Sequence, residues 1–223
     1  MHTAKTTPLA VLLLIATWLL TPAAWAGQTI LVFGDSLSAN YGMAVESGWV
    51  NLLQQRLARD HQEIAVVNAS ISGETTAGGL ARIGATLARH KPDIVIVELG
   101  ANDGLRGLSL EATTSNLEGI IRACLAARAR VLLLGMRLPP NYGESYVTGF
   151  AAVYAALARK HRTALVPFLL DGIANSRESF QADNLHPTAT AQPQVLENVW
   201  RALQPMLAQP SPVVPTGRPA NRG

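Results

Sequence analysis

Cysteine is nearly absent from this chain of 223 residues, in which Cys124 is the only example. A single cysteine cannot form a disulfide within the chain, even in an oxidising compartment that would permit one. Cys124 lies in the segment NLEGIIRACLAARAR, where apolar residues recur at helical spacing. We therefore expect it to be a small buried hydrophobic residue rather than a nucleophile.

The sequence also lacks a basic patch of the kind that binds nucleic acids. Its 18 lysines and arginines are nearly balanced by 15 aspartates and glutamates, and no run of arginines is interleaved with aromatic residues. A nucleic-acid partner is therefore not expected. No internal repeat marks a second domain, and the length suits one domain with a sizeable core.

A hydrophobic run long enough to span a membrane is missing as well. The longest apolar run, Leu9–Leu20, has about 12 residues, whereas a spanning helix needs about 20. Lys5 precedes this run, and Ala24-Trp25-Ala26 follows it in the A-x-A pattern of a cleavage site. We interpret residues 1–26 as a secretory signal peptide, which implies a periplasmic or secreted protein. An uncleaved membrane anchor is the alternative.

The other end of the chain has an unusual composition. Residues 209–223 contain four prolines and no hydrophobic periodicity. Such a segment cannot bury enough apolar surface to fold, so we predict a disordered tail. The segment 27–208 is then the single folded domain.

Within this domain, apolar β-branched runs alternate with segments of helical spacing. The runs predicted as strands are 29–33, 64–70, 93–99, 130–136 and 164–170. The segments predicted as helices are 49–58, 75–90, 110–128, 145–161 and 188–207. Strands that are apolar on both faces and separated by helices are typical of a parallel sheet covered on both sides. The predicted fold is an α/β, three-layer doubly wound sandwich with a five-stranded parallel sheet in the flavodoxin-like order 2-1-3-4-5.

Three of the predicted strands are followed by residues suited to catalysis. The first strand leads into Ser36, the second is followed by Gly73 and the third by Asn102. In the predicted order these ends are neighbours at the topological switch point, where ligands bind. A serine hydroxyl attacks a carbonyl once a base takes its proton, and backbone N–H groups and an amide can stabilise the oxyanion that forms. Taken singly, the segments SGET and GANDG fit ordinary turns equally well.

The base that a serine needs is most often a histidine oriented by a carboxylate. His186 lies three residues after Asp183 in the segment QADNLHPTATAQ, just before the last predicted helix. This spacing lets the carboxylate accept one ring N–H while the other ring nitrogen faces outward. The alternative is that Asp183 or Thr188 caps the last helix and His186 is incidental. The other histidines of the domain lie at helix ends and are interpreted as surface positions.

Four short blocks resemble, in order, those of the SGNH hydrolase superfamily. They are Gly34-Asp35-Ser36-Leu37, Gly73, Gly100-Ala101-Asn102-Asp103 and Asp183-Asn184-Leu185-His186. The segments NASISGETT, VELGANDGLRG, RLPPNYG and DNLHP further resemble the bacterial group of periplasmic thioesterases I, proteases I, lysophospholipases and arylesterases. The resemblance extends over nearly all of residues 28–207 and fails only in the proline-rich tail.

The resemblance implies a role for each of these residues. Ser36 corresponds to the nucleophile, His186 to the general base and Asp183 to the acid that orients the base. The oxyanion hole would consist of the Ser36 N–H, the Gly73 N–H and the Asn102 side chain. No metal or cofactor is needed for this chemistry.

The resemblance also implies an activity, the hydrolysis of acyl esters and thioesters through an acyl-enzyme. Fatty acyl esters, acyl-CoA and lysophospholipids are the implied substrates, with transient contact with membrane lipids, and a monomer is expected. The sequence departs from the usual pattern at Ala101, where glycine or another small residue is common, and at Asn184, where close relatives often have glycine. A carbohydrate acetylesterase of the same superfamily and a non-catalytic flavodoxin-like binding module are the alternatives.

Two loops beside the predicted oxyanion hole carry apolar residues where an acyl chain would lie. These residues are Leu105, Leu108, Leu138 and Tyr142. Apolar residues clustered in solvent-facing loops are typical of a binding surface. The alternative is that the leucines pack onto the sheet. Glycines on both sides of Leu105 would let the first loop move when a chain enters.

Overall fold

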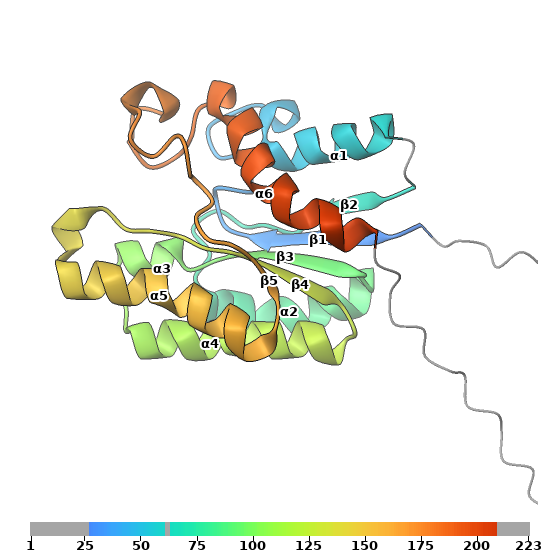
Figure 1. Ribbon diagram of the computed structural model, residues 1–223, viewed down its shortest axis with the longest axis horizontal. Helices are drawn as coiled ribbons and strands as arrows, with labels where there is room; N and C mark the ends of the chain where they lie inside the picture. Colours follow the sequence, from blue (N-terminus) through green and yellow to red (C-terminus); the bar gives the residue numbers. More distant parts are fainter. Residues whose placement is uncertain (1–26, 61–62, 209–223) are drawn as a thin grey trace, which may run out of the picture.

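The structure of the protein is a computed structural model that describes residues 27–60 and 63–208. The predicted signal peptide (1–26) and proline-rich tail (209–223) lie outside the described residues. In the part of the chain that is described, no helix is both long enough and apolar enough to cross a membrane. This part forms three layers, with helices on both faces of a central sheet (Figure 1).

The central sheet consists of five parallel strands in the order β2-β1-β3-β4-β5, which confirms the predicted topology. The strands are β1 (Thr29–Gly34), β2 (Ala65–Asn68), β3 (Ile94–Glu98), β4 (Arg130–Leu134) and β5 (Ala164–Val166). In the register between the two central strands, Gly34 at the end of β1 lies beside Glu98 at the end of β3. The segments that follow these strands therefore begin side by side, at the switch point of the fold.

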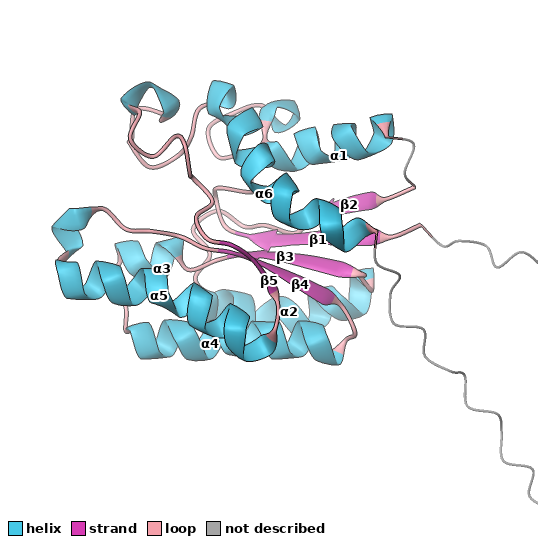
Figure 2. Cartoon of the chain, viewed as in Figure 1, coloured by secondary structure: helices cyan, strands magenta, loops and turns pink. Residues whose placement is uncertain are grey.

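Helices cover both faces of the sheet (Figure 2). They are α1 (Trp49–Arg59), α2 (Thr76–His90), α3 (Ala101–Leu105), α4 (Leu110–Ala126), α5 (Glu144–His161) and α6 (Gln192–Leu207). Four 3-10 helices lie in the connections: η1 (Val45–Ser47), η2 (Pro140–Tyr142), η3 (Arg177–Ser179) and η4 (Ala189–Ala191). On one face α1 packs against α6, and on the other α4 packs between α2 and α5.

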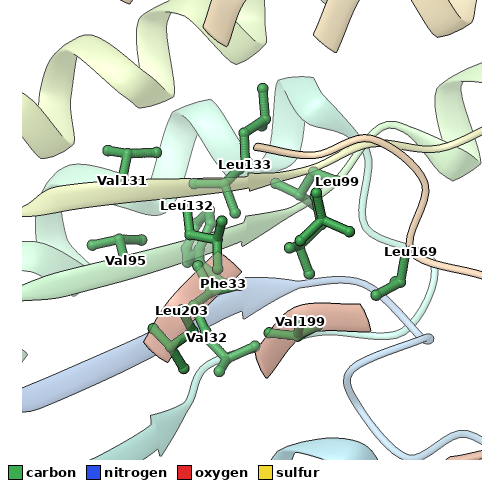
Figure 3. Close-up of a cluster of buried hydrophobic side chains, with 14 of the residues drawn as sticks. Val32, Phe33, Val95, Leu99, Val131, Leu132, Leu133, Leu169, Val199 and Leu203 are labelled. Atoms are coloured by element: carbon green, nitrogen blue, oxygen red, sulfur yellow. The ribbon is translucent and has the colours of Figure 1, made fainter. Parts of the chain in front are cut away.

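Side chains of β1 alternate between the two helical layers. Val32 points toward Val199 and Leu203 of α6 (Figure 3). Phe33 instead packs on α2, where a Cβ added to Gly79 would lie 3.3 Å from its ring. These apolar side chains are fully buried, and burial of each contributes roughly 1.5–3 kcal/mol. The carboxyl edge of the sheet is thus fixed by packing from both sides.

Cys124 is fully buried on α4, as the sequence predicts. Burial raises the pKa of its thiol to about 12. The thiolate, which is the nucleophilic form, is therefore scarce at neutral pH.

Two element boundaries differ from the prediction because of proline. Strand β5 ends at Val166 rather than at residue 170, since Pro167 has no N–H with which to continue the ladder. The last helix begins at Gln192 rather than at residue 188, with Pro193 in its first turn, where no N–H is needed. Both changes lengthen the connection between β5 and α6, which carries Asp183 and His186.

Candidate active site

Ser36 lies two residues beyond β1, in a turn at the carboxyl edge of the sheet. The Asp35 carbonyl closes this turn by accepting hydrogen bonds from the N–H groups of Ser38 (3.2 Å) and the next residue (3.0 Å). Glycine suits position 34, because a Cβ there would lie 2.9 Å from the backbone carbonyl oxygen of Glu98 and 2.6 Å from its Oε2. The strand therefore continues close against β3 until the turn presents the Ser36 hydroxyl.

His186 approaches Ser36 from the distant end of the chain. It lies in the loop between η3 and η4, and its Nε2 atom is 2.8 Å from Ser36 Oγ. An isolated antiparallel bridge between Phe180 and Pro187 closes this loop at its base. At this distance an unprotonated Nε2 can accept the hydroxyl proton.

Asp183 sets the position and the tautomer of His186. Its Oδ2 lies 2.7 Å from Nδ1, and its Oδ1 accepts hydrogen bonds from the N–H groups of Leu185 (2.9 Å) and His186 (3.1 Å). Partial burial raises the pKa of the Asp183 carboxyl, but these hydrogen bonds outweigh it and lower the pKa to about 2. An ionised Asp183 accepts a hydrogen bond from the Nδ1–H of His186, and in this neutral tautomer Nε2 carries no proton.

The backbone of this turn explains one departure from the pattern described above. Asn184, between Asp183 and His186, has a left-handed φ of 59°. Asparagine is several-fold enriched in that conformation and can take the place of glycine there. The Asp183-to-His186 spacing is thereby preserved without glycine.

Asn102 lies in α3, which the sequence analysis did not predict because GANDG reads as a turn. Within GANDG, only Gly100, at the N-cap of this helix, has a left-handed backbone, with φ of 113°. Asn102 Nδ2 donates a hydrogen bond to Asp35 Oδ2 at 3.0 Å. An amide nitrogen carries two N–H groups, so the second one is available to a ligand.

Two backbone N–H groups complete the candidate oxyanion hole. Within residues 27–60 and 63–208, neither the Ser36 N–H nor the Gly73 N–H has a hydrogen-bond acceptor. Gly73 has φ of 79°, and a Cβ there would meet nothing closer than Arg106 Nη2 at 3.9 Å. Backbone conformation rather than lack of space therefore selects glycine at this position.

Two carboxyl groups that the sequence analysis did not single out are buried together beside Ser36. Asp35 and Glu98 are both 0% exposed, and Glu98 Oε2 accepts hydrogen bonds from the Asp35 N–H (3.2 Å) and Ser38 Oγ (2.8 Å). Burial raises the pKa of Asp35 to about 6. Burial, followed by the charge of Asp35, raises the pKa of Glu98 well above its ordinary value. The available sequence signal was an acid ending the apolar run DIVIVE.

This raised pKa predicts how Glu98→Gln should change stability. Because the folded state holds the Glu98 proton more tightly than the unfolded chain does, stability is full below the unfolded pKa and falls as pH rises through the folded pKa. Glutamine cannot ionise and retains an oxygen for Ser38. Between pH 4.5 and 8, the free energy of unfolding of the variant should therefore fall less than that of the parent.

Urea titrations of both proteins at several pH values measure this difference. Glu46→Gln, at an exposed residue of η1 outside the cavity, is the control, because it removes the same formal charge elsewhere. Parallel curves for the parent and the Glu98→Gln variant would instead show that Glu98 has the same pKa in the folded and unfolded states.

The candidate nucleophile, base and oxyanion donors surround a cavity of about 700 Å³. Ser36, Gly73, Asn102 and His186 all contribute to its wall. Much of the remaining wall is apolar: Leu37, Leu105, Met136, Leu138, Pro139, Pro140, Phe168, Leu170, Ala174, Phe180 and Leu185. The cavity can therefore hold an apolar group next to the Ser36 hydroxyl.

The four apolar residues predicted to contact substrate fall into two pairs. Leu105 and Leu138 line the cavity, whereas Leu108 and Tyr142 are not among its lining residues. Leu108 is 41% exposed, and the Tyr142 hydroxyl donates a hydrogen bond to the Leu105 carbonyl (3.0 Å). The expectation that all four face solvent was wrong for Leu138, which is 8% exposed because it packs against Gly104 of α3.

This chain is similar in sequence and in fold to known esterases. The chain is 52% identical over 182 residues to Esterase TesA from Pseudomonas aeruginosa, covering 82% of this chain and 90% of that protein. It is 42% identical over 189 residues to Thioesterase 1/protease 1/lysophospholipase L1 from Escherichia coli strain K12, covering 85% of this chain and 89% of that one. A crystal structure of TesA, 52% identical, matches 80% of this chain and 99% of its own with a TM-score of 0.79.

The match to a protein family agrees with the individual relatives. Residues 32–192, from β1 to the start of α6, match the GDSL-like Lipase/Acylhydrolase family. This span contains all four blocks described above, from the GDSL segment to His186. The chain therefore belongs to the GDSL-like lipase/acylhydrolase family of SGNH hydrolases.

Proposed function

We propose that this protein is a serine esterase in which Ser36 is the nucleophile, His186 the general base and Asp183 the acid that orients the base. One observation carries the proposal: two short contacts link Asp183 Oδ2 to His186 Nδ1 (2.7 Å) and His186 Nε2 to Ser36 Oγ (2.8 Å). A serine in such a chain of contacts is activated for attack on a carbonyl carbon.

The first half of the reaction transfers the acyl group to the enzyme. Ser36 Oγ forms a bond to the carbonyl carbon while its proton passes to His186 Nε2. The negative charge on the carbonyl oxygen is stabilised by the N–H groups of Ser36 and Gly73 and by the Asn102 amide, and loss of one such donor typically lowers kcat by about 10²- to 10³-fold. The bond to the leaving alcohol or thiol then breaks, and His186 gives it the proton.

The second half releases the acid and restores the serine. His186 takes a proton from a water molecule, whose oxygen attacks the acyl carbon of the ester on Ser36. The oxyanion again lies at the same donors. When the intermediate collapses, the bond to Ser36 Oγ breaks and His186 returns the proton to the hydroxyl.

Fatty acyl esters are the substrate class that the cavity supports best. Its apolar wall lies next to Ser36, so an acyl chain could be buried while its carbonyl reaches the nucleophile. The thioesterase and lysophospholipase activities in the name of the Escherichia coli relative suggest thioesters and lysophospholipids as further substrates. A carbohydrate acetylesterase would instead need a mostly polar cleft.

Export would decide which of these substrates the enzyme meets. Residues 1–26 have the pattern of a cleavable signal peptide, so we propose a periplasmic or secreted enzyme. The periplasm contains little acyl-CoA, which makes lipid esters the natural substrates under this proposal.

The chain-length dependence of hydrolysis tests this substrate class. Each methylene buried in the cavity contributes up to about 0.8 kcal/mol, so kcat/KM should rise from acetyl to medium-chain p-nitrophenyl esters until the cavity is full. Leu105→Ser makes the wall polar and should flatten this rise while leaving acetyl-ester hydrolysis within about twofold.

Leu108→Ser is the matched control, since Leu108 lies in the same segment but does not line the cavity. It should keep the parental dependence on chain length. A parent enzyme that prefers acetyl esters would contradict the proposed substrate class and favour the acetylesterase alternative. Equal flattening by both serine variants would contradict the assignment of Leu105 to the acyl site.

A further inference from the structure

An exposed aromatic side chain covers the ring of His186. Tyr41 lies five residues after Ser36, and its ring is stacked on the imidazole with centroids 4.2 Å apart and planes tilted by 31°. Tyr41 is nevertheless 49% exposed and lies at the wall of the cavity rather than in the core. Burial of the tyrosine alone does not explain its position.

Gln181 fastens the loop of His186 to the loop that follows Ser36. Its side-chain Nε2 donates hydrogen bonds to the carbonyls of Tyr41 (2.9 Å) and Pro187 (3.1 Å). Its backbone N–H donates to the His186 carbonyl (2.8 Å), and its own carbonyl accepts from the Asn184 N–H (3.1 Å). One residue therefore closes the His186 loop on itself and joins it to the nucleophile loop.

The backbone next to Tyr41 is shaped to receive the Gln181 side chain. Gly42 has φ of 71°, and a Cβ there would lie 2.2 Å from Gln181 Oε1. A side chain at position 42 would therefore displace the amide as well as strain the backbone. On its N-terminal side, Tyr41 is joined to the nucleophile: its N–H donates a long hydrogen bond (3.4 Å) to the Ser36 carbonyl.

We propose that Tyr41 and Gln181 are positioning residues that hold His186 Nε2 within reach of Ser36 Oγ, an inference that rests on the proposed function. Tyr41 stops the imidazole from tilting into the cavity, and Gln181 fixes the distance between the two loops. Asp183 alone cannot do this, because it belongs to the same loop as His186 and moves with it. A displacement of about 1 Å at a reacting group can lower the rate by about 100-fold.

Steady-state kinetics with p-nitrophenyl butyrate test this proposal. Tyr41→Ala should lower kcat by about 10- to 100-fold with KM changed by less than about threefold. Tyr41→Phe keeps the ring and should retain at least about a third of the parental kcat. Gln181→Met keeps the length of the side chain but has no N–H donor, and should lower kcat about 10-fold. The double variant Tyr41→Ala/Gln181→Met should show a smaller fold-loss of kcat than the product of the two single fold-losses, because both residues act on one imidazole.

The rate of labelling by a fluorophosphonate gives a second readout that involves only attack by Ser36. It should fall in parallel with kcat in Tyr41→Ala and Gln181→Met, and stay near the parental rate in Tyr41→Phe. Val45→Ala, at an exposed residue of the same connection outside the cavity, should leave both rates unchanged.

Three results would overturn the proposal. A raised KM with unchanged kcat in Tyr41→Ala would make Tyr41 a substrate contact. A parental kcat in folded Gln181→Met would show that the Gln181 hydrogen bonds do not position His186. Equal losses of kcat in Tyr41→Phe and Tyr41→Ala would show that ring stacking is not what positions His186. Because Tyr41 is half-exposed, its variants should fold, so this comparison can be made even if Gln181→Met does not fold. If the otherwise parental enzyme kept its activity when Ser36 is replaced by alanine, the proposed function itself would be refuted.

Discussion

Ser36→Ala should lower kcat for ester hydrolysis by roughly four to six orders of magnitude while the protein remains folded. Without the hydroxyl, no acyl-enzyme can form and His186 has no proton to accept from position 36. The oxyanion donors and the cavity remain, so weak residual hydrolysis above the rate in water is expected. The change removes one oxygen from a turn closed by the backbone and by Asp35, so the fold should tolerate it.

Three measurements on the purified variant check this result. Hydrolysis of p-nitrophenyl butyrate gives the rate, circular dichroism reports the fold, and a fluorophosphonate probe reports the reactive serine. Ser145→Ala, an exposed serine near the start of α5 that does not line the cavity, should keep full activity and labelling. Near-parental turnover or labelling in folded Ser36→Ala would mean that another residue is the nucleophile.

The sequence was sufficient to predict which loops meet, because strand order alone determines that. Parallel strands have their carboxyl ends at one edge, and the order 2-1-3-4-5 makes the ends of β1, β2 and β3 neighbours. Ser36, Gly73 and Asn102 follow these three strands and line one cavity. His186 could be singled out by its spacing from Asp183, since that spacing forms a local turn closed by hydrogen bonds within three residues.

The sequence was not sufficient where a side chain depends on a partner far away in the chain. Leu108 and Leu138 both appear as apolar residues in loops, yet one is 41% exposed and the other 8% exposed. Leu138 differs from Leu108 because it packs against Gly104 of α3. The contact of Glu98 with Asp35 spans 63 residues, and that of Gln181 with Tyr41 spans 140. No local pattern marks contacts of this kind.

His186→Ala should abolish activity almost as completely as loss of Ser36, because the variant lacks the Nε2 atom that lies 2.8 Å from Ser36 Oγ and accepts its proton. Asp183→Asn should be less severe than His186→Ala. Its amide NH2 group can donate a hydrogen bond to Nδ1, which favours the tautomer with the proton on Nε2, where the imidazole cannot take the Ser36 proton. The expected order of kcat/KM is parent, then Asp183→Asn, then His186→Ala, with the last lower than the parent by roughly 10⁴-fold or more.

The pH dependence of kcat/KM separates Asp183 from the groups that lose a proton nearer neutral pH, which include the buried Asp35 with its pKa of about 6. His186 accepts a proton only in its neutral form, so kcat/KM should rise from acid toward alkaline pH and then reach a plateau. The pKa of Asp183 is lowered to about 2, so its carboxylate is already ionised throughout this rise, and the loss of activity in acid cannot come from its protonation. His90→Ala, at the last residue of α2 and outside the cavity, should leave the profile unchanged. A His186→Ala enzyme with the parental rate and the parental profile would remove His186 from the mechanism, and the assignment of Asp183 would be lost with it.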